Sequence, residues 1–178
     1  MIQKEDTVSD KSESDSAPKV GDLAPDFTLP THNEGELNLA WYRGRKNVLL
    51  AFFPAAWTPV CATHVPNYQQ DIEAFNRLDC QVLAVSVDPL PSLTAWAKTL
   101  GGLSFPLMSD FWPHGDVASR YGVFYDRKGF AERVVFLIDK KGIVRYIERV
   151  PLAEVPDNKK ALAVLRELQR EHAGRAGI

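Results

Sequence analysis

One stretch of the chain restricts its fold more than any other: the apolar run from Val48 to Phe53, which lies between Lys46-Asn47 and Pro54. Six apolar residues without polar alternation are typical of a strand that is buried on both faces, and such a strand needs covering layers on both sides of its sheet. A second run of this kind follows at residues 81–87. Between the two runs, apolar residues recur at spacings of three and four, which predicts one helix from about residue 60 to residue 78. Its apolar positions are Val65, Tyr68, Ile72, Phe75 and Leu78.

The rest of the chain continues this alternation of strands and helices. The expected elements are helices at residues 91–100, 116–121 and 158–172, a brief strand at 105–108, and strands at 132–138 and 143–148. The last two strands flank Asp139-Lys140-Lys141-Gly142, a short glycine-containing loop that is typical of a β-hairpin. The apolar face of the last helix includes Leu162, Val164, Leu165 and Leu168. This order predicts an α/β, thioredoxin-like fold, in which a central mixed β-sheet is flanked by helices on both faces.

Length and composition indicate one domain with a polar tail. Residues 1–18 are charged and rich in Ser and Asp, so we expect a disordered tail there and a single domain at residues 19–178. A formal net charge of -2 lacks the positive excess with which nucleic-acid-binding proteins neutralise phosphates. No apolar run approaches the roughly 20 residues that cross a bilayer, and residues 1–20 lack the apolar stretch of a secretory signal. The sequence therefore predicts a cytoplasmic protein that binds neither nucleic acid nor membranes.

The segment around the first of two cysteines is the candidate active site. Two cysteines, Cys61 and Cys80, are too few for a disulfide scaffold, and their spacing fits neither a CxxC motif nor a zinc site. Cys61 is expected on the first turn of a helix, where unpaired N–H groups and the helix dipole favour the thiolate, which is the nucleophilic form. Thr58, three residues earlier, can offer its hydroxyl to the sulfur or to an oxygen that is bound beside it.

The segment from Pro54 to Cys61 has the pattern Pro-x-x-x-Thr-x-x-Cys, which resembles the active-site motif of peroxiredoxins of the AhpC/TSA superfamily. The stretch Val20-Gly21-Asp22-Leu23-Ala24-Pro25-Asp26-Phe27-Thr28-Leu29 is similar to the opening strand of that family. Residues 105–115 (FPLMSDFWPHG), followed by Tyr121-Gly122-Val123-Phe124, are similar to the bacterial one-cysteine AhpE branch. Arg133, just before a predicted strand, matches the active-site arginine of the family.

The resemblance implies a thiol-dependent peroxidase that reduces hydrogen peroxide and organic hydroperoxides. The Cys61 thiolate would attack one peroxide oxygen, expel an alcohol or water, and become a sulfenic acid. Fixed donors would stabilise the charge that moves to oxygen, namely the Thr58 hydroxyl, the Arg133 guanidinium and the backbone N–H groups of Val60 and Cys61. Pro54 would limit access to the sulfenate. Because the thiolate itself supplies two electrons, the resemblance implies no cofactor and no metal.

At position 64 the sequence departs from the family, because a histidine replaces the usual glutamate. His64 shares a helix face with Cys61, one turn away. A protonated imidazole there would favour the thiolate, whereas a neutral one would be a packed neighbour or a hydrogen-bond partner. Position alone favours a structural role over a catalytic one.

Recycling of the sulfenic acid needs a second thiol. Cys80 lies beyond a predicted helix of roughly 18 residues, on the order of 27 Å long, whereas a disulfide needs Cα atoms within about 7 Å. We therefore expect Cys80 to be a small buried residue and the reductant to be an external thiol: mycothiol with a mycoredoxin, glutathione with a glutaredoxin, or thioredoxin. The resemblance also implies a homodimer or a larger homo-oligomer.

Two other functions remain open on sequence alone. A thiol–disulfide oxidoreductase would need a second thiol in the stretch Cys61-Ala62-Thr63-His64, which lacks one. A redox-sensing or holdase protein could use the same scaffold, although the Pro-x-x-x-Thr-x-x-Cys pattern and Arg133 are all retained.

An aromatic cluster lies apart from this motif. His114 with Phe111 and Trp112 could line the peroxide pocket or a subunit interface, although aromatic clusters more often pack. The four histidines of the chain lack the spacing of metal ligands.

Overall fold

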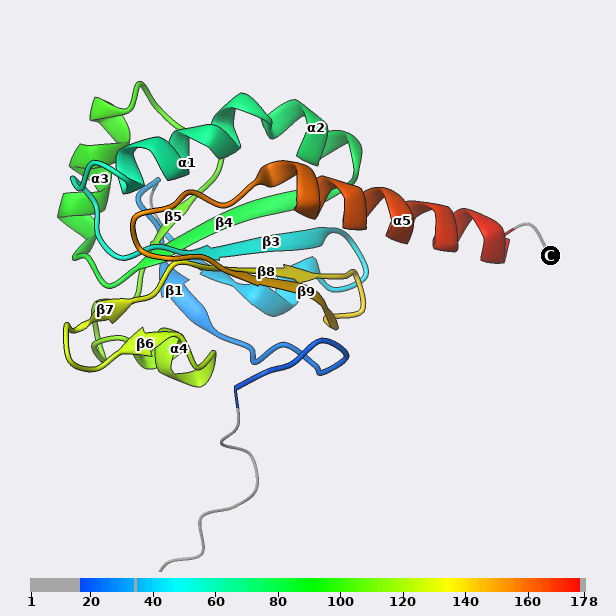
Figure 1. Ribbon diagram of the computed structural model, residues 1–178, viewed down its shortest axis with the longest axis horizontal. Helices are drawn as coiled ribbons and strands as arrows, with labels where there is room; N and C mark the ends of the chain where they lie inside the picture. The colour runs from blue at the N-terminus through cyan, green and yellow to red at the C-terminus, as the bar shows by residue number, and fades with distance from the viewer. Residues whose placement is uncertain (1–16, 34, 177–178) are drawn as a thin grey trace, which may run out of the picture.

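A five-stranded mixed sheet forms the centre of the molecule (Figure 1). The computed structural model describes residues 17–33 and 35–176, so the expected tail at residues 1–18 lies almost entirely outside the described residues. The strand order is β5 (Leu107–Ser109), β4 (Cys80–Ser86), β3 (Asn47–Phe52), β8 (Val134–Ile138) and β9 (Val144–Arg149). β3 pairs parallel with β4 and antiparallel with β8, which makes the sheet mixed, as predicted.

Helices cover both faces of this sheet. One face carries α1 (Cys61–Gln70), α2 (Ile72–Arg77), α3 (Leu90–Thr99) and α5 (Asn158–Ala176). In Figure 1, α1 and α2 are seen above the strands and α3 at their left end. The other face carries α4 (Asp116–Arg120), the 3-10 helix Leu39–Tyr42, and residues of β1 (Thr28–Pro30) and β7 (Phe130–Ala131). β2 (Glu36–Asn38) pairs with β1, and β6 (Phe124–Tyr125) pairs with β7. The predicted α/β, thioredoxin-like architecture is confirmed.

The central position of β3 explains its apolar sequence. Successive side chains of a strand point to opposite faces, so Leu49 and Ala51 enter the layer beneath α1, while Leu50 and Phe52 enter the layer of α4. All four of these side chains are fully buried. Because both faces of β3 are covered, a polar side chain at any of these positions would have no contact with water. This explains why polar and apolar residues do not alternate along the strand.

The prediction of one helix over residues 60–78 is wrong, because the helix breaks at Asp71 between α1 and α2. The side-chain amide of Asn158, at the start of α5, donates to the Asn67 carbonyl at 3.1 Å and to the Asp71 carboxylate at 2.9 Å. This contact takes up groups at the end of α1 and fixes the turn there. The partner comes 87 residues after Asp71, so helical periodicity could not reveal it.

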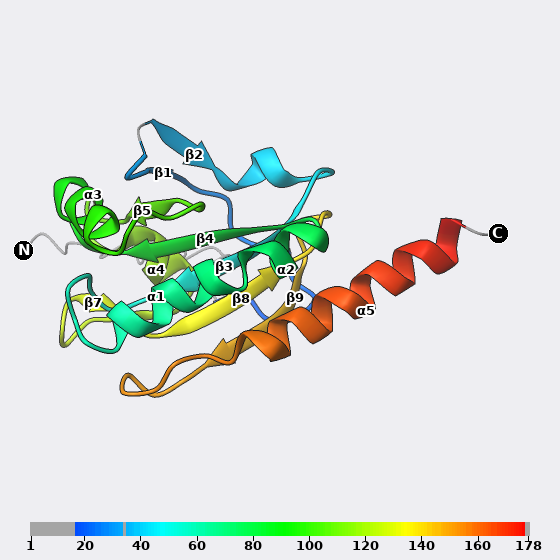
Figure 2. The same ribbon diagram turned by 90° about the horizontal axis from the view of Figure 1, so that it is seen from above.

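The remaining elements begin and end within a few residues of their predicted bounds. The last helix is longer than expected, ending at Ala176 instead of residue 172, and its C-terminal half extends past the ends of the central strands (Figures 1 and 2). The short pairs β1–β2 and β6–β7 were not predicted, except that the resemblance placed an opening strand at residues 20–29, of which β1 includes only Thr28 and Leu29. Among the described residues, no helix combines the length and the apolar character that crossing a membrane requires.

We predict that Gly142→Ala destabilises the hairpin between β8 and β9. Gly142 has φ +84, a backbone angle that opposes a side chain, and a Cβ there would also lie 2.9 Å from Nε of the exposed Arg43 side chain, which would have to shift. Left-handed backbone costs about 1–2 kcal/mol for other residues, and we expect a loss of this size in the free energy of unfolding, measured in urea. The matched control is Gly174→Ala in α5, which should leave stability unchanged or raise it, since alanine favours helix. Equal losses in the two variants would contradict this explanation.

Candidate active site

Cys61 is the first residue of α1, and the loop at residues 53–60 connects it to the end of the central strand β3. No side chain caps this helix N-terminus. Among the described residues, the backbone N–H groups of Val60 and Cys61 have no hydrogen-bond partner, whereas the next ones donate to Thr58 and Val60 carbonyls. The Cys61 side chain is fully buried. The sulfur therefore lies at an uncapped helix start, where free N–H groups and the helix dipole favour negative charge.

The loop before α1 is tied to the segment that follows β4. The Ala56 N–H donates to Asp88 Oδ2 at 2.8 Å, and the Ser86 hydroxyl donates to the same oxygen at 2.6 Å. Trp57 has φ 68, and its indole N–H donates to the Ser92 hydroxyl at 3.1 Å. These bonds fix the loop that delivers Cys61 to its position.

Thr58 and Pro54 lie in this loop, as the motif requires. The Thr58 side chain is half-buried and its hydroxyl donates to the Ala55 carbonyl at 2.9 Å, so it does not bond the sulfur, one of the two acceptors that the sequence suggested. Because the proton is used there, the oxygen of Thr58 is left as an acceptor. Pro54 is buried.

Arg133 reaches the cysteine from the segment between β7 and β8. Its Nη2 donates to Cys61 Sγ at 3.4 Å and to the Leu152 carbonyl at 3.0 Å, and its Nη1 lies 2.8 Å from His64 Nδ1. Arg133 is 1% exposed, and its Nε has no hydrogen-bond partner among the described residues. No ion pair of the described part of the chain involves Arg133. The guanidinium is thus a buried cation that no carboxylate neutralises.

His64 links this arginine to a buried tyrosine. His64 Nε2 lies 2.7 Å from the hydroxyl of Tyr68, and both side chains are 1% exposed. Burial, followed by the positive charge of Arg133, lowers the pKa of His64 to about 3. Burial, followed by the charge of Glu148, raises the pKa of Tyr68 above its usual value. From the sequence, a neutral His64 could be either a packed neighbour or a hydrogen-bond partner, and the structure shows a hydrogen-bond partner.

Cys80 lies far from this site. In the parallel register of β3 and β4, Cys80 pairs with Asn47 at the start of β3, whereas Cys61 follows the end of that strand. Six strand residues span on the order of 20 Å, so the two sulfurs are separated even though the intervening helix is broken. Both cysteines are free and buried, and burial raises the pKa of Cys80 to about 12. Cys80 is the small buried residue that we expected.

The aromatic cluster at residues 111–114 divides into a packed and an exposed part. His114 Nε2 lies 2.7 Å from the Gly129 carbonyl, and its ring contacts those of Phe111 and Phe124. Trp112, in contrast, is 82% exposed. The cluster therefore packs through His114 and presents Trp112 to the surface.

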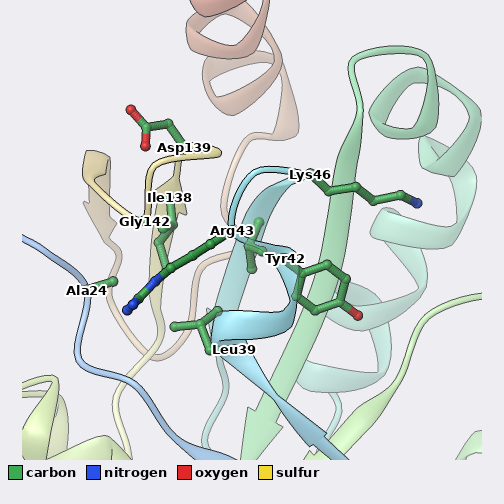
Figure 3. A pocket seen from close by; sticks show the side chains of 9 residues that line it. Ala24, Leu39, Tyr42, Arg43, Lys46, Ile138, Asp139 and Gly142 are labelled. Carbon is green, nitrogen blue, oxygen red and sulfur yellow. The ribbon is translucent and has the colours of Figure 1, made fainter.

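A small cavity of about 10 Å³ is shown in Figure 3. Val48 at the start of β3 and Ile138 at the end of β8 line it, so it lies at the opposite end of these strands from Cys61. It has room for about one water molecule, and Arg43 extends across it between Ala24 and Ile138. None of the predicted site residues lines it. Within the described ranges, no cluster of three or more His, Cys, Asp or Glu side chains is suited to hold a metal ion.

The structure brings Cys61, Arg133 and His64 together and adds two groups that sequence reasoning missed. Tyr68 was identified only as an apolar helix position, although its spacing of four residues from His64 could have indicated the contact. The contact with the Leu152 carbonyl could not be predicted from the sequence, because every residue has a backbone carbonyl.

Comparison with known proteins agrees with this fold. The family model described as AhpC/TSA family matches residues 20–147. Alkyl hydroperoxide reductase E of Mycobacterium tuberculosis is 45% identical over 149 residues, covering 82% of this chain and 97% of that protein. Mouse peroxiredoxin-2 is 35% identical over 160 residues, covering 85% of this chain and 78% of that protein. The reduced 2-Cys peroxiredoxin of Plasmodium vivax has a TM-score of 0.79 at 29% identity, covering 86% of this chain and 83% of that chain.

The mixed sheet, with a buried cysteine at the start of α1 that a buried arginine contacts, is that of a class of proteins, the thioredoxin-like thiol peroxidases. The chain belongs to the AhpC/TSA family, the peroxiredoxins. Its reaction accordingly takes a peroxide as substrate and a thiol as reductant. The family does not favour the alternatives of a thiol–disulfide oxidoreductase or a holdase.

We predict that Cys80 is chemically inert in the folded protein. With a pKa of about 12, its thiolate fraction at pH 8 is roughly one in ten thousand, and its side chain is fully buried. In the Cys61→Ser variant, an aromatic disulfide reagent should therefore not react with Cys80 while the protein is native. The same sample in urea should react to one thiol per chain. Rapid reaction without denaturant would contradict the placement of Cys80.

Proposed function

We propose that this protein is a cytoplasmic one-cysteine peroxiredoxin that reduces hydrogen peroxide and organic hydroperoxides through Cys61. The observation that carries the proposal is the contact between Cys61 Sγ and the buried guanidinium of Arg133. A buried cation without a counterion costs several kcal/mol. The other two groups on Arg133 are a carbonyl and a neutral imidazole, so the Cys61 thiolate is the anion that compensates this charge.

The thiolate attacks the terminal oxygen of ROOH in line with the O–O bond. A sulfur–oxygen bond forms as the O–O bond breaks, so the sulfur loses two electrons and the peroxide gains them. The sulfur carries away the terminal OH as sulfenic acid, and the leaving RO⁻ takes a proton from water and departs as ROH.

The residues around Cys61 divide this work between them. The Nε of Arg133 and the backbone N–H groups of Val60 and Cys61 are donors without partners, and we assign them to the peroxide oxygens as negative charge develops. The Thr58 oxygen is the acceptor for the hydrogen of the incoming hydroperoxide. Pro54, buried in the same loop, limits access to the sulfenic acid.

An external thiol then reduces the sulfenic acid, because Cys80 is buried at the other end of β3. Mycothiol with a mycoredoxin, glutathione with a glutaredoxin, and thioredoxin are the candidate reductants. We further propose a homodimer or larger homo-oligomer. The exposed aromatic side chains of Trp57, Phe111 and Trp112 support this proposal, since large apolar side chains at the surface favour association.

We predict that Cys61 alone forms sulfenic acid. Stoichiometric hydrogen peroxide in the presence of dimedone should add one dimedone to wild type and to Cys80→Ser, and none to Cys61→Ser, as measured by intact mass. A rapid loss of two hydrogens that requires both cysteines would instead make Cys80 the resolving residue. If Cys61 stays unmodified at low peroxide, the proposed function is wrong.

We predict that Arg133→Lys lowers the rate constant for sulfenic acid formation by about 100-fold or more. Lysine keeps the charge, but one ammonium group cannot bind the sulfur, the Leu152 carbonyl and His64 in the planar geometry of a guanidinium. Stopped-flow measurement of Cys61 oxidation checks this value. The matched control is Arg145→Lys, whose ion pairs with Asp139 and Glu171 lie away from the site, and it should react as wild type does.

A further inference from the structure

His64 contacts Arg133, which in turn contacts the sulfur of Cys61, but the proposed reaction assigns no role to His64. Its protonation follows from the geometry. A guanidinium has only donors, so the Nδ1 atom that lies 2.8 Å from Arg133 Nη1 must be an acceptor. The neutral ring then carries its hydrogen on Nε2 and donates it to the Tyr68 hydroxyl at 2.7 Å. The two contacts therefore select a single tautomer.

Apart from the Cys61 thiolate, no charged group around His64 neutralises the Arg133 guanidinium among the described residues. Cys61 and Tyr68 face His64 from its own helix, and Arg133 faces it from the segment between β7 and β8. The charge of Glu148 on β9 raises the pKa of Tyr68, but the Glu148 carboxylate accepts a hydrogen bond from the Lys160 ammonium group. Burial and the neighbouring cation lower the pKa of His64 to about 3, so the imidazole is neutral at physiological pH.

We propose that His64 is a positioning residue that holds Arg133 on the Cys61 sulfur without neutralising it, and so keeps the site open to peroxides that carry negative charge. This inference rests on the proposed function. With a neutral imidazole, the thiolate and the guanidinium sum to zero charge. A carboxylate at position 64 would make the same group of side chains negative and repel an anionic peroxide before it reached the sulfur.

Peroxymonosulfate is a suitable anionic probe, and hydrogen peroxide is its neutral counterpart. The thiolate takes the terminal OH of HOOSO₃⁻ to form sulfenic acid, the O–O bond breaks, and sulfate leaves with both electrons of that bond. Atoms and charge balance without any other reactant. Both probes are small, so a difference between them reports on charge more than on fit.

Wild-type protein allows a first test that needs no variant of His64. Long-range ¹H–¹⁵N spectra of ¹⁵N-histidine-labelled protein should show His64 with its hydrogen on Nε2 and with no titration between pH 5 and pH 8. An Nδ1–H tautomer, or a titration near the ordinary histidine pKa, would overturn the inference.

Three substitutions give the second test, in which sulfenic acid formation is timed with each probe. His64→Leu removes the acceptor and should slow both reactions by roughly tenfold or more. His64→Asn places an oxygen where Nδ1 lies, and it should restore both rates with the wild-type pH profile between pH 5 and 8. His64→Glu adds a charge, and it should slow peroxymonosulfate on the order of tenfold more than hydrogen peroxide.

The outcomes separate this inference from the proposed function. If His64→Leu reacts as wild type does, or if His64→Glu leaves the ratio of the two rates unchanged, the role of His64 is wrong while the peroxidase stands. If wild type forms no Cys61 sulfenic acid with hydrogen peroxide, the proposed function itself fails. Thermal unfolding of each variant shows whether it folds. If His64→Leu does not fold, the histidine spectra of the wild type still decide whether the inference holds.

Discussion

The site depends on one buried cation. The guanidinium of Arg133 is enclosed almost completely and has no carboxylate partner among the described residues, so its burial is unfavourable unless its surroundings compensate it. Compensation comes from three directions: the sulfur of Cys61, the imidazole of His64 and the carbonyl of Leu152. The same contacts that make burial of the cation tolerable make the thiolate favourable, so stability and reactivity have a common origin here.

The fold brings these groups together from three separate segments. Cys61 and His64 lie on the first turns of α1, Arg133 lies between β7 and β8, and Leu152 lies between β9 and α5. The central strand β3 joins them, because the loop at its end leads into α1, while β8 pairs with it antiparallel and therefore begins at that same end. The first residue of β8, Val134, pairs with the last residue of β3, Phe52, which places Arg133 beside the loop that leads to Cys61.

Much of this could be predicted from the sequence, and the failures have identifiable causes. The buried runs of β3 and β4 were located within one residue, because a strand with no solvent-facing side shows no polar alternation. The break between α1 and α2 was missed because it depends on Asn158, a partner from another helix. The donation of the Thr58 hydroxyl to Ala55 was missed as well, since a hydroxyl chooses among acceptors that only the folded loop presents.

The sequence by itself determined the layered α/β architecture and the motif that makes Cys61 the proposed nucleophile, because these depend on local patterns of burial and on residues close together in the chain. Only the tertiary structure decided the charge of His64. At position 64 the sequence allowed either a protonated or a neutral imidazole, and the choice follows from burial and from an arginine 69 residues away. Protonation depends on the surroundings in space, and for a buried side chain those surroundings consist largely of residues that are distant in the chain.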